Sequence, residues 1–588
     1  MLTVPSATEI KSLVNVALGN EEADLAIVNG DLVNVYTGEL LKGQSIAIKG
    51  KWIAYVGSDA GHAIGPETEV IDASGKTLVP GFIDGHTHML WFYPLEEFLK
   101  YSMKSGTTTV ISETIDFSFT LGYEGIVQFL ESVEDQPIKI FATLPSTYAN
   151  GQAGYADVIT PAMFHELLEH DGILGLGESN WLPVIRGDNR VLDLFADTLA
   201  QGKKLEGHSA GARGNKLVAY VASGISSCHE SITAREALER LRLGLHVMMR
   251  EGEVRKDIES VAQIKDERID FRRLAVATDG VGARHLMEHG YLDYVVQRAI
   301  ELGFDPITAI QMATLNVAEH FSIDNIVGGI APGKYADIVI ISSLTSIKPE
   351  CVISSGRVVA KDGKPLVEPK RYTYPESSRT TVRLPRRLEA ADFAIRVGSG
   401  AGEVTARVID LSPNIMNKEA LITMPVSGGE IKSDISRDIL KVAAIDRLSN
   451  SAKMFVGLVR GFQLKKGAFA ATANWDVSNV LVVGASEEDM AGAVNRIWEL
   501  QGGAVVYADG EVQAELPMPI AGCISDLPME AVADRLERIQ QELADLGCQI
   551  PDPHLLLTTL TTPILPALRI STDGLIGVKE GKVIDLIV

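Results

Sequence analysis

The residues of this chain best suited to chemistry are histidines and carboxylates that follow short apolar runs. His86 and His88 end one such run, and side chains two positions apart in an extended strand point the same way. Two imidazoles on one face provide half of a metal site, because imidazole is a good ligand for Zn, Fe, Cu and Ni. A solvated strand can carry His-x-His by chance, so the interpretation depends on finding the other ligands.

Four further candidate ligands occur later in the chain. Glu178, His208, His229 and Asp279 each close a short segment of mainly apolar residues. Each of them alone is more typical of a structural residue than of a ligand. Together with the His-x-His pair they supply four imidazoles and two carboxylates, which is enough to hold two divalent ions with Glu178 as the bridge.

Such a set predicts hydrolytic chemistry. Two ions about 3.5–4 Å apart can share a hydroxide, because a bound water has its pKa lowered to about 7. Asp279 would bind one ion and hydrogen-bond the hydroxide, and could therefore take and return a proton during attack. Glu178 and Asp279 are the predicted catalytic residues.

The ligands need elements that bring them together. Between residues 78 and 325, eight apolar strand candidates alternate with helical patterns and end near residues 88, 112, 146, 179, 209, 230, 253 and 279. Eight βα units in about 250 residues are typical of a (β/α)₈ barrel, whose chemistry lies at the C-terminal ends of its strands. A doubly wound open sheet is the alternative.

The flanks of this region predict an α/β protein of several domains. Short strand patterns before and after the barrel favour one β-sandwich built from both segments. We expect an N-terminal segment with the first part of the sandwich at 1–77, the metal-binding barrel at 78–325, the second part of the sandwich at 326–371, a linker at 372–387 and a C-terminal α/β domain at 388–588.

Composition excludes some classes of partner. The 588 residues carry a net charge of −23, which argues against a nucleic-acid surface but not against a small nucleobase. The four scattered cysteines do not suggest a disulfide framework, and no apolar span of about 18 residues predicts a membrane helix. We expect a cytoplasmic enzyme, and its size is compatible with a homo-oligomer.

These motifs resemble the amidohydrolase superfamily and, over nearly the whole length, bacterial adenine deaminases. The shared runs are at 106–110, 175–178, 207–208, 240–244, 293–296, 333–337, 493–496, 563–569 and 574–575. The resemblance implies hydrolysis of adenine to hypoxanthine and ammonia by two divalent ions, most often Mn or Fe, with Zn also compatible. It assigns the metal to His86, His88, Glu178, His208, His229 and Asp279, with Glu178 where many amidohydrolases carry a carbamylated lysine.

The chain departs from the family in the predicted pocket. Leu90-Trp91-Phe92 replaces a Glu-Ser-Ser run, residues 113–116 replace Asp-Pro-His-Glu, residues 473–479 replace Ala-His-Asp-Ser-His-Asn, and Gly280 replaces an Asp. We therefore predict substrate contacts from an altered set, namely Trp91, Phe92, Glu113, Asp116 and Trp475.

Three functions compete on this evidence. The leading hypothesis is deamination of adenine or a related aminopurine. The same metals and hydroxide could instead cleave a cyclic amide or deaminate another aromatic heterocycle. A non-enzymatic scaffold is disfavoured, because all six ligand positions are kept.

Overall fold

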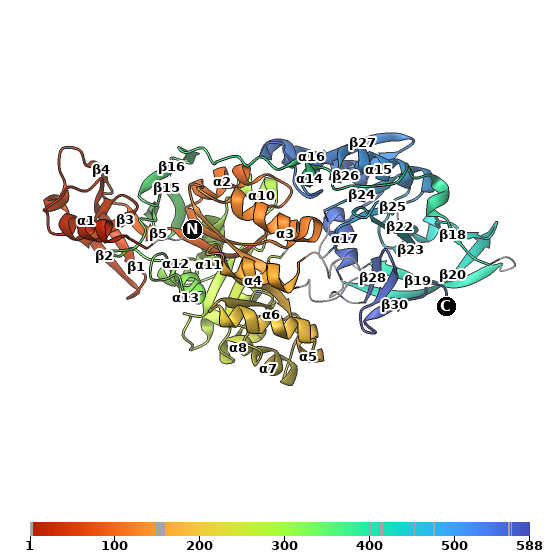
Figure 1. Ribbon diagram of the computed structural model, residues 1–588, viewed down its shortest axis with the longest axis horizontal. Coiled ribbons are helices and arrows are strands. Elements are labelled where there is room, and N and C mark those ends of the chain that lie inside the picture. Colours follow the sequence, from red (N-terminus) through yellow and green to blue (C-terminus); the bar gives the residue numbers. More distant parts are fainter. Residues whose placement is uncertain are drawn as a thin grey trace. The chain divides into compact units, whose positions relative to one another are not determined.

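The structure, a computed structural model, describes residues 4–146, 159–253, 255–398, 402–411, 416–451, 453–473, 477–562, 565 and 567–588. The chain divides into two units, which are described separately (Figure 1). Unit 1 comprises Met1–Met89, Leu95–Thr114 and Val127–Tyr372, and unit 2 comprises Leu90–Pro94, Ile115–Ile126 and Thr373–Val588. Two short segments that follow predicted site residues thus belong to unit 2.

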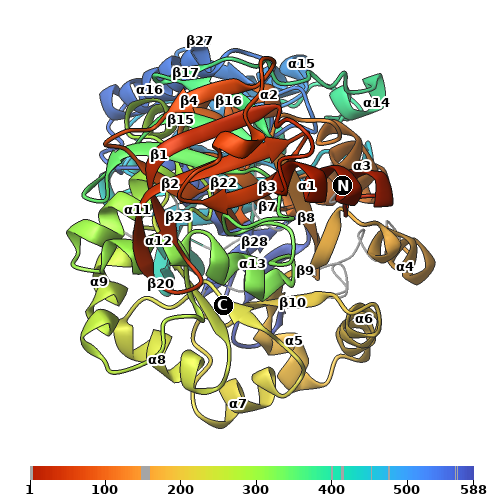
Figure 2. The ribbon, with the colours of Figure 1, turned by 90° about the vertical axis from the view of Figure 1, so that its left-hand side faces the viewer.

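Unit 1 contains a nine-stranded sheet built from two distant parts of the chain. Figure 2 shows the N-terminal strands beside β15 and β16. Val79 pairs with Val339 where the two parts join in antiparallel register, and the core beneath includes Ile27, Ile46 and Ile338. The strands are β1 (Leu25–Asn34), β2 (Glu39–Lys49), β3 (Trp52–Gly57), β4 (Glu69–Asp72), β5 (Thr77–Pro80), β14 (Ile338–Ser343), β15 (Ser346–Ser354), β16 (Arg357–Lys361) and β17 (Lys364–Pro365).

The predicted ligands lie on eight parallel strands arranged in two sheets. The five-stranded sheet contains β6 (Phe82–Thr87), β7 (Thr107–Glu113), β8 (Lys139–Pro145), β9 (Ile173–Asn180) and β10 (Lys204–His208), and the three-stranded sheet contains β11 (Ser227–Cys228), β12 (His246–Arg250) and β13 (Leu274–Ala277). All residues of β6 and β13 are buried, as expected of parallel strands covered on both faces. The α/β class is confirmed, and both sheets match the alternation expected from the sequence.

The helices of unit 1 mostly follow these strands in turn. Figure 2 shows α4, α6, α7 and α8 following one another along the outside of the strands. The helices are α1 (Ala7–Ala17), α2 (Leu95–Lys104), α4 (Pro161–Glu169), α5 (Trp181–Arg186), α6 (Asn189–Ala200), α7 (Asn215–Val221), α8 (Ala234–Arg242), α9 (Ile258–Val261), α10 (Ala283–Glu288), α11 (Leu292–Glu301), α12 (Pro306–Met312) and α13 (Leu315–Phe321). In α3 (Ile115–Ser132), which contributes to both units, Gly122 has a φ of 62° and marks a kink.

Unit 2 has a ten-stranded sheet and a separate three-stranded sheet. Helix α15 (Glu487–Leu500) buries Met490, Ala493, Val494 and Ile497, whose spacing places them on one face against the larger sheet. The other helices are α14 (Glu376–Arg379), α16 (Met529–Asp545) and α17 (Pro553–Thr558). Within the described parts of both units, no helix has the length and apolar character required to span a membrane.

The strands of unit 2 alternate with long turns. They are β18 (Ile395–Arg396), β19 (Glu403–Leu411), β20 (Asn417–Ser427), β21 (Glu430–Ile431), β22 (Ile439–Asp446), β23 (Met454–Arg460), β24 (Ala468–Ala471), β25 (Asn479–Gly484), β26 (Gly503–Ala508), β27 (Glu511–Pro517), β28 (Leu568–Ser571), β29 (Gly574–Gly577) and β30 (Lys582–Ile584). Val382 and Leu384 join the core beneath α15, so the chain leading into this unit packs against its sheet.

Candidate functional site

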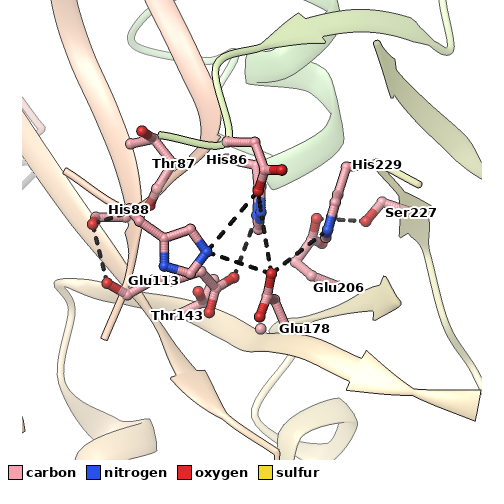
Figure 3. Close-up of polar contacts among 12 residues, drawn as sticks. His86, Thr87, His88, Glu113, Thr143, Glu178, Glu206, Ser227 and His229 are labelled. Carbon is pink, nitrogen blue, oxygen red and sulfur yellow. Dashed lines mark hydrogen bonds and ion pairs between the residues drawn. The ribbon is translucent and has the colours of Figure 1, made fainter. Parts of the chain in front are cut away.

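The side chain of Glu178 lies at the centre of a buried cluster in unit 1. Three imidazoles approach its Oε1 atom from different strands, as Figure 3 shows. The Nε2 atoms of His86 and His88 lie 3.6 and 3.5 Å from this oxygen, and that of His229 lies 3.6 Å away. The ends of β6, β9 and β11 thus bring together residues that are far apart in the sequence.

Asp279 completes one side of the cluster. Its Oδ1 atom is 3.2 Å from Nε2 of His86 and 4.0 Å from Nε2 of His88. Its other oxygen accepts a hydrogen bond of 3.0 Å from Nη1 of Arg250, whose guanidinium also donates to Asp257. The carboxylate is thereby oriented with one oxygen toward the imidazoles and the other toward a cation.

His208 and His229 form the other side of the cluster. Together with Glu178 they offer ligand atoms within 4.8 Å of one another, and so do the four residues His86, His88, Glu178 and Asp279. The two groups share Glu178. Nε2 of His208 also lies 2.5 Å from Oε1 of Glu230. All six ligands predicted from the sequence therefore lie in one place.

The backbone at both carboxylates is unusual. Glu178 has a φ of 32° and Asp279 a φ of 62°, in the left-handed region that residues with a side chain seldom adopt. Such strain persists only where the surroundings enforce it, and it is concentrated at functional sites. Gly177 is also required here, because a Cβ atom on it would lie 2.1 Å from Oε2 of Glu113.

The cluster fits divalent metal ions. Imidazole nitrogens and carboxylate oxygens bind Zn²⁺ at about 2.0–2.2 Å, so donor atoms on one ion lie roughly 3–4 Å apart. The contacts around Glu178 already have this spacing. Nε2 of His229 is buried without a hydrogen bond from any described residue, and an ion would provide its partner.

The electrostatics favour the ligand forms of the central residues. Burial alone would raise the pKa of Glu178, but His86 and His88 hold that pKa well below its ordinary value. Burial likewise acts against ionisation of Asp279, yet Arg250 keeps the pKa of this carboxyl low. Burial and the proximity of His86 hold the pKa of His229 well below its usual range, so its imidazole is neutral and able to bind a metal.

The five predicted substrate contacts lie in different places. Glu113 belongs to the metal cluster, with Oε1 at 3.4 Å from Nδ1 of His86. Trp91, Phe92 and Asp116 belong to unit 2, where all three line one pocket. Trp475 lies outside the described residues.

Sequence reasoning missed several supporting residues. Arg250 ends β12 and could have been recognised as a charged residue at a strand end, while Glu230 follows a predicted ligand directly. Asp84, two residues before His86, accepts hydrogen bonds of 2.6 Å from Thr278 and Tyr291 and so ties the ends of β6 and β13 together. No sequence pattern identified the partners of this aspartate.

Comparisons with known proteins agree with this geometry. Residues 77–359 match the amidohydrolase family, and residues 414–582 match the adenine deaminase C-terminal domain. The chain is 39% identical to an adenine deaminase of Moorella thermoacetica over 99% of both chains. It is 36% identical to one of Clostridium botulinum strain Loch Maree, over 98% of this chain and 97% of the relative, and 36% identical to adenine deaminase 3 of Rhizobium meliloti, over 98% of each. The resemblance in the sequence motifs is thus confirmed, and the chain belongs to the adenine deaminase family of amidohydrolases.

Proposed function

We propose that this protein is a metal-dependent hydrolase that converts adenine and water to hypoxanthine and ammonia. The observation that carries the proposal is the convergence of three imidazoles on one carboxylate oxygen, in a chain that belongs to the adenine deaminase family. A related aminopurine remains the alternative substrate, because the residues after His88 depart from the family pattern.

The two parallel sheets would form one (β/α)₈ barrel. Two backbone hydrogen bonds between the sheets support this arrangement. The N–H of Asp279 donates to the carbonyl of His86 at 3.1 Å, and the N–H of Ser226 donates to the carbonyl of Leu205 at 2.9 Å. A closed barrel would place every predicted ligand at its C-terminal face, where such folds carry their chemistry.

The metal residues would divide into two sets that share Glu178. One set comprises His86, His88 and Asp279, and the other comprises His208 and His229. We propose Mn or Fe as the ions, with Zn also compatible with these nitrogen and oxygen ligands. When bound, such ions supply water activated at neutral pH and stabilise developing negative charge.

The protein's own residues would manage the proton. Attack of water at C6 of adenine forms a C–O bond, and Asp279 accepts the proton that water loses. Because Arg250 already occupies Oδ2, the proton is received at Oδ1. Asp279 then returns the proton to the amino group, the C6–N bond breaks, and ammonia leaves a ring that carries the new oxygen.

The direct test is ammonia release by Mn-loaded protein from adenine, guanine, a pterin and a cyclic amide such as hydantoin. We expect adenine to give ammonia and hypoxanthine in equal amounts, with about two metal equivalents bound. Protein with two ions bound that releases no ammonia from adenine would contradict the proposal, and turnover of the cyclic amide alone would favour the alternative amidohydrolase activity.

Three further expectations remain proposals. They are the domain limits given above, a homo-oligomeric state and a cytoplasmic location. Light scattering of the purified protein tests the second of these directly.

A further inference from the structure

Unit 2 contains a pocket that the metal cluster does not include. It has a volume of about 630 Å³, part of it open to solvent, which is in the range of small-molecule sites. Its described lining residues all belong to unit 2, and they include Trp91 and Phe92, which follow the ligand His88 by three and four positions. Three residues span at most about 11 Å, so Trp91 cannot be far from that ligand whatever the arrangement of the units.

The aromatic side of the pocket is held in place. The rings of Trp91 and Phe92 have centroids 5.1 Å apart, and the ring of Phe92 lies 4.8 Å from that of His554. Phe92 has a φ of 70°, and its carbonyl accepts a hydrogen bond of 2.9 Å from the N–H of Ser525. A strained aromatic residue held by its neighbours is typical of a preformed binding surface for a flat ring.

His554 provides a polar group on this aromatic wall. Its side chain is 8% exposed, and its Nε2 atom makes no hydrogen bond with any described residue. Burial lowers the pKa of this imidazole to about 4, so the ring is neutral at neutral pH. A buried polar atom that lines a pocket without a protein partner is a natural contact for a ligand, because leaving it unpaired is costly.

The charges of the pocket disfavour an anionic ligand. Asp116 and Asp552 contribute carboxylates, and the guanidinium of Arg447 is already hydrogen-bonded to Thr381, Thr120 and the carbonyl of Ala521. A phosphate would meet two like charges here. A neutral ring with an exocyclic amino group would instead offer donors to the carboxylates.

We infer that this pocket recognises a neutral purine base without a phosphate, and that Nε2 of His554 is its specific hydrogen-bonding contact. The identity of the base rests on the proposed function. The aromatic rings bind the face of the base, and the histidine and a carboxylate read its edge. His554 is therefore a specificity residue, separate from the groups that move the proton.

The test replaces His554 by Phe, which keeps a flat ring of similar size and removes the hydrogen bond. Adenine affinity is measured by calorimetry on metal-free protein, and KM and kcat are measured with Mn. We expect His554→Phe to raise both the Kd and the KM for adenine about tenfold, while kcat and metal content stay within a factor of two or three. His554→Gln, which keeps a polar group, should recover part of the affinity and serves where the Phe variant does not fold.

His165→Phe is the matched control, because His165 lies exposed on α4 with Glu169 as its neighbour. It should leave Kd and KM unchanged. Adenosine monophosphate is the second probe, and we expect it to bind at least tenfold more weakly than adenine. Equal binding of the two probes, or unchanged Kd and KM in both folded His554 variants, would overturn the inference.

The outcomes separate this inference from the proposed function. If wild-type protein releases ammonia from adenine but the His554 variants keep its affinity, the pocket assignment is wrong and the reaction stands. If adenine binds and the variants weaken it but no ammonia forms, the pocket assignment stands and the reaction is wrong.

Discussion

The metal cluster of unit 1 and the pocket of unit 2 are built from different kinds of contact. Around Glu178, buried imidazoles and carboxylates hold one another at 3.2–3.6 Å, and Arg250 fixes Asp279 from behind. Around Phe92, aromatic rings are combined with hydroxyl groups and two carboxylates. The first arrangement suits charge and proton transfer, and the second suits the recognition of a flat neutral ring.

The departures from the family pattern are divided in the same way. All six predicted ligands lie in the metal cluster, whereas Leu90-Trp91-Phe92 and Asp116 belong to unit 2. Glu113 is the exception, since it contacts His86. The difference suggests that the chain retained its chemistry while its recognition surface changed, and variants in each region should therefore affect different kinetic constants.

The largest effect should come from Glu178→Gln. The neutral amide removes the negative charge shared by both groups of ligands, so we expect metal content to fall from two equivalents to one or fewer. Since bound metal supplies several kcal/mol of transition-state stabilisation, kcat should drop by about 10³-fold or more. Metal analysis and steady-state kinetics measure the two effects.

Glu169→Gln is the control for this change, because Glu169 is exposed at the end of α4. It should alter neither constant. A Glu178→Gln protein that keeps two ions and wild-type kcat would remove this carboxylate from the centre of the site and break the comparison at its strongest point.

Arg250→Gln should have the next largest effect. The change leaves the buried carboxylates of Asp257 and Asp279 without their cation, which costs about 3–5 kcal/mol of folding stability. Because partners that orient metal ligands contribute about 10–100-fold to metal affinity or activity, kcat should fall in that range while KM changes little. Denaturant unfolding and kinetics test both expectations.

Arg250→Lys separates orientation from charge. It keeps the cation but cannot contact both carboxylates with a planar fork, so stability should be partly restored and kcat less so. Arg272→Gln, at an exposed site beside Glu319, should leave kcat unchanged. Full recovery of kcat by Arg250→Lys would show that charge alone is required.

The metal ligands could be predicted because each one follows an apolar strand whose limits the sequence indicates. His88, Glu178, His208 and Asp279 lie within two residues of the ends of their observed strands. Their function depends on residue type and on strand order, both of which are local properties or follow from the fold class. The family resemblance then assigned the bridging position to Glu178.

The supporting contacts could not be predicted in the same way. Asp84 and Tyr291 are 207 positions apart, and only the folded chain brings the carboxylate and the phenol together. His554 lies far beyond the barrel on a six-residue helix, where no periodic pattern indicates a binding role. Its importance comes from burial and from the missing hydrogen bond, which are properties of the packed structure.

Trp91→Leu should shift recognition more than chemistry. Stacking of a base on an aromatic ring contributes about 1–3 kcal/mol, so we expect KM for adenine to rise about tenfold with kcat and metal content maintained. Trp498→Leu is the control within unit 2, because Trp498 packs on the core under α15. That variant should lower the melting temperature and leave KM unchanged.

Asp116→Asn should give the smallest effect and the sharpest distinction between the two regions. The amide keeps the size of the side chain in the pocket but removes its charge, and an amino group binds a carboxylate more strongly than an amide oxygen. We expect KM for adenine to rise about threefold to tenfold at constant kcat. Asp509→Asn, an exposed position paired with Lys466, is the control and should change neither.

The direction of this split decides which region Asp116 serves. The residue follows Glu113 by three positions, and Glu113 lies in the metal cluster, so a role in proton relay is the competing interpretation. A relay would lower kcat in Asp116→Asn and leave KM nearly constant, because the loss would occur only in the transition state. An increase in KM alone would assign the carboxylate to recognition, together with Trp91 and His554 and apart from the ligands of Glu178.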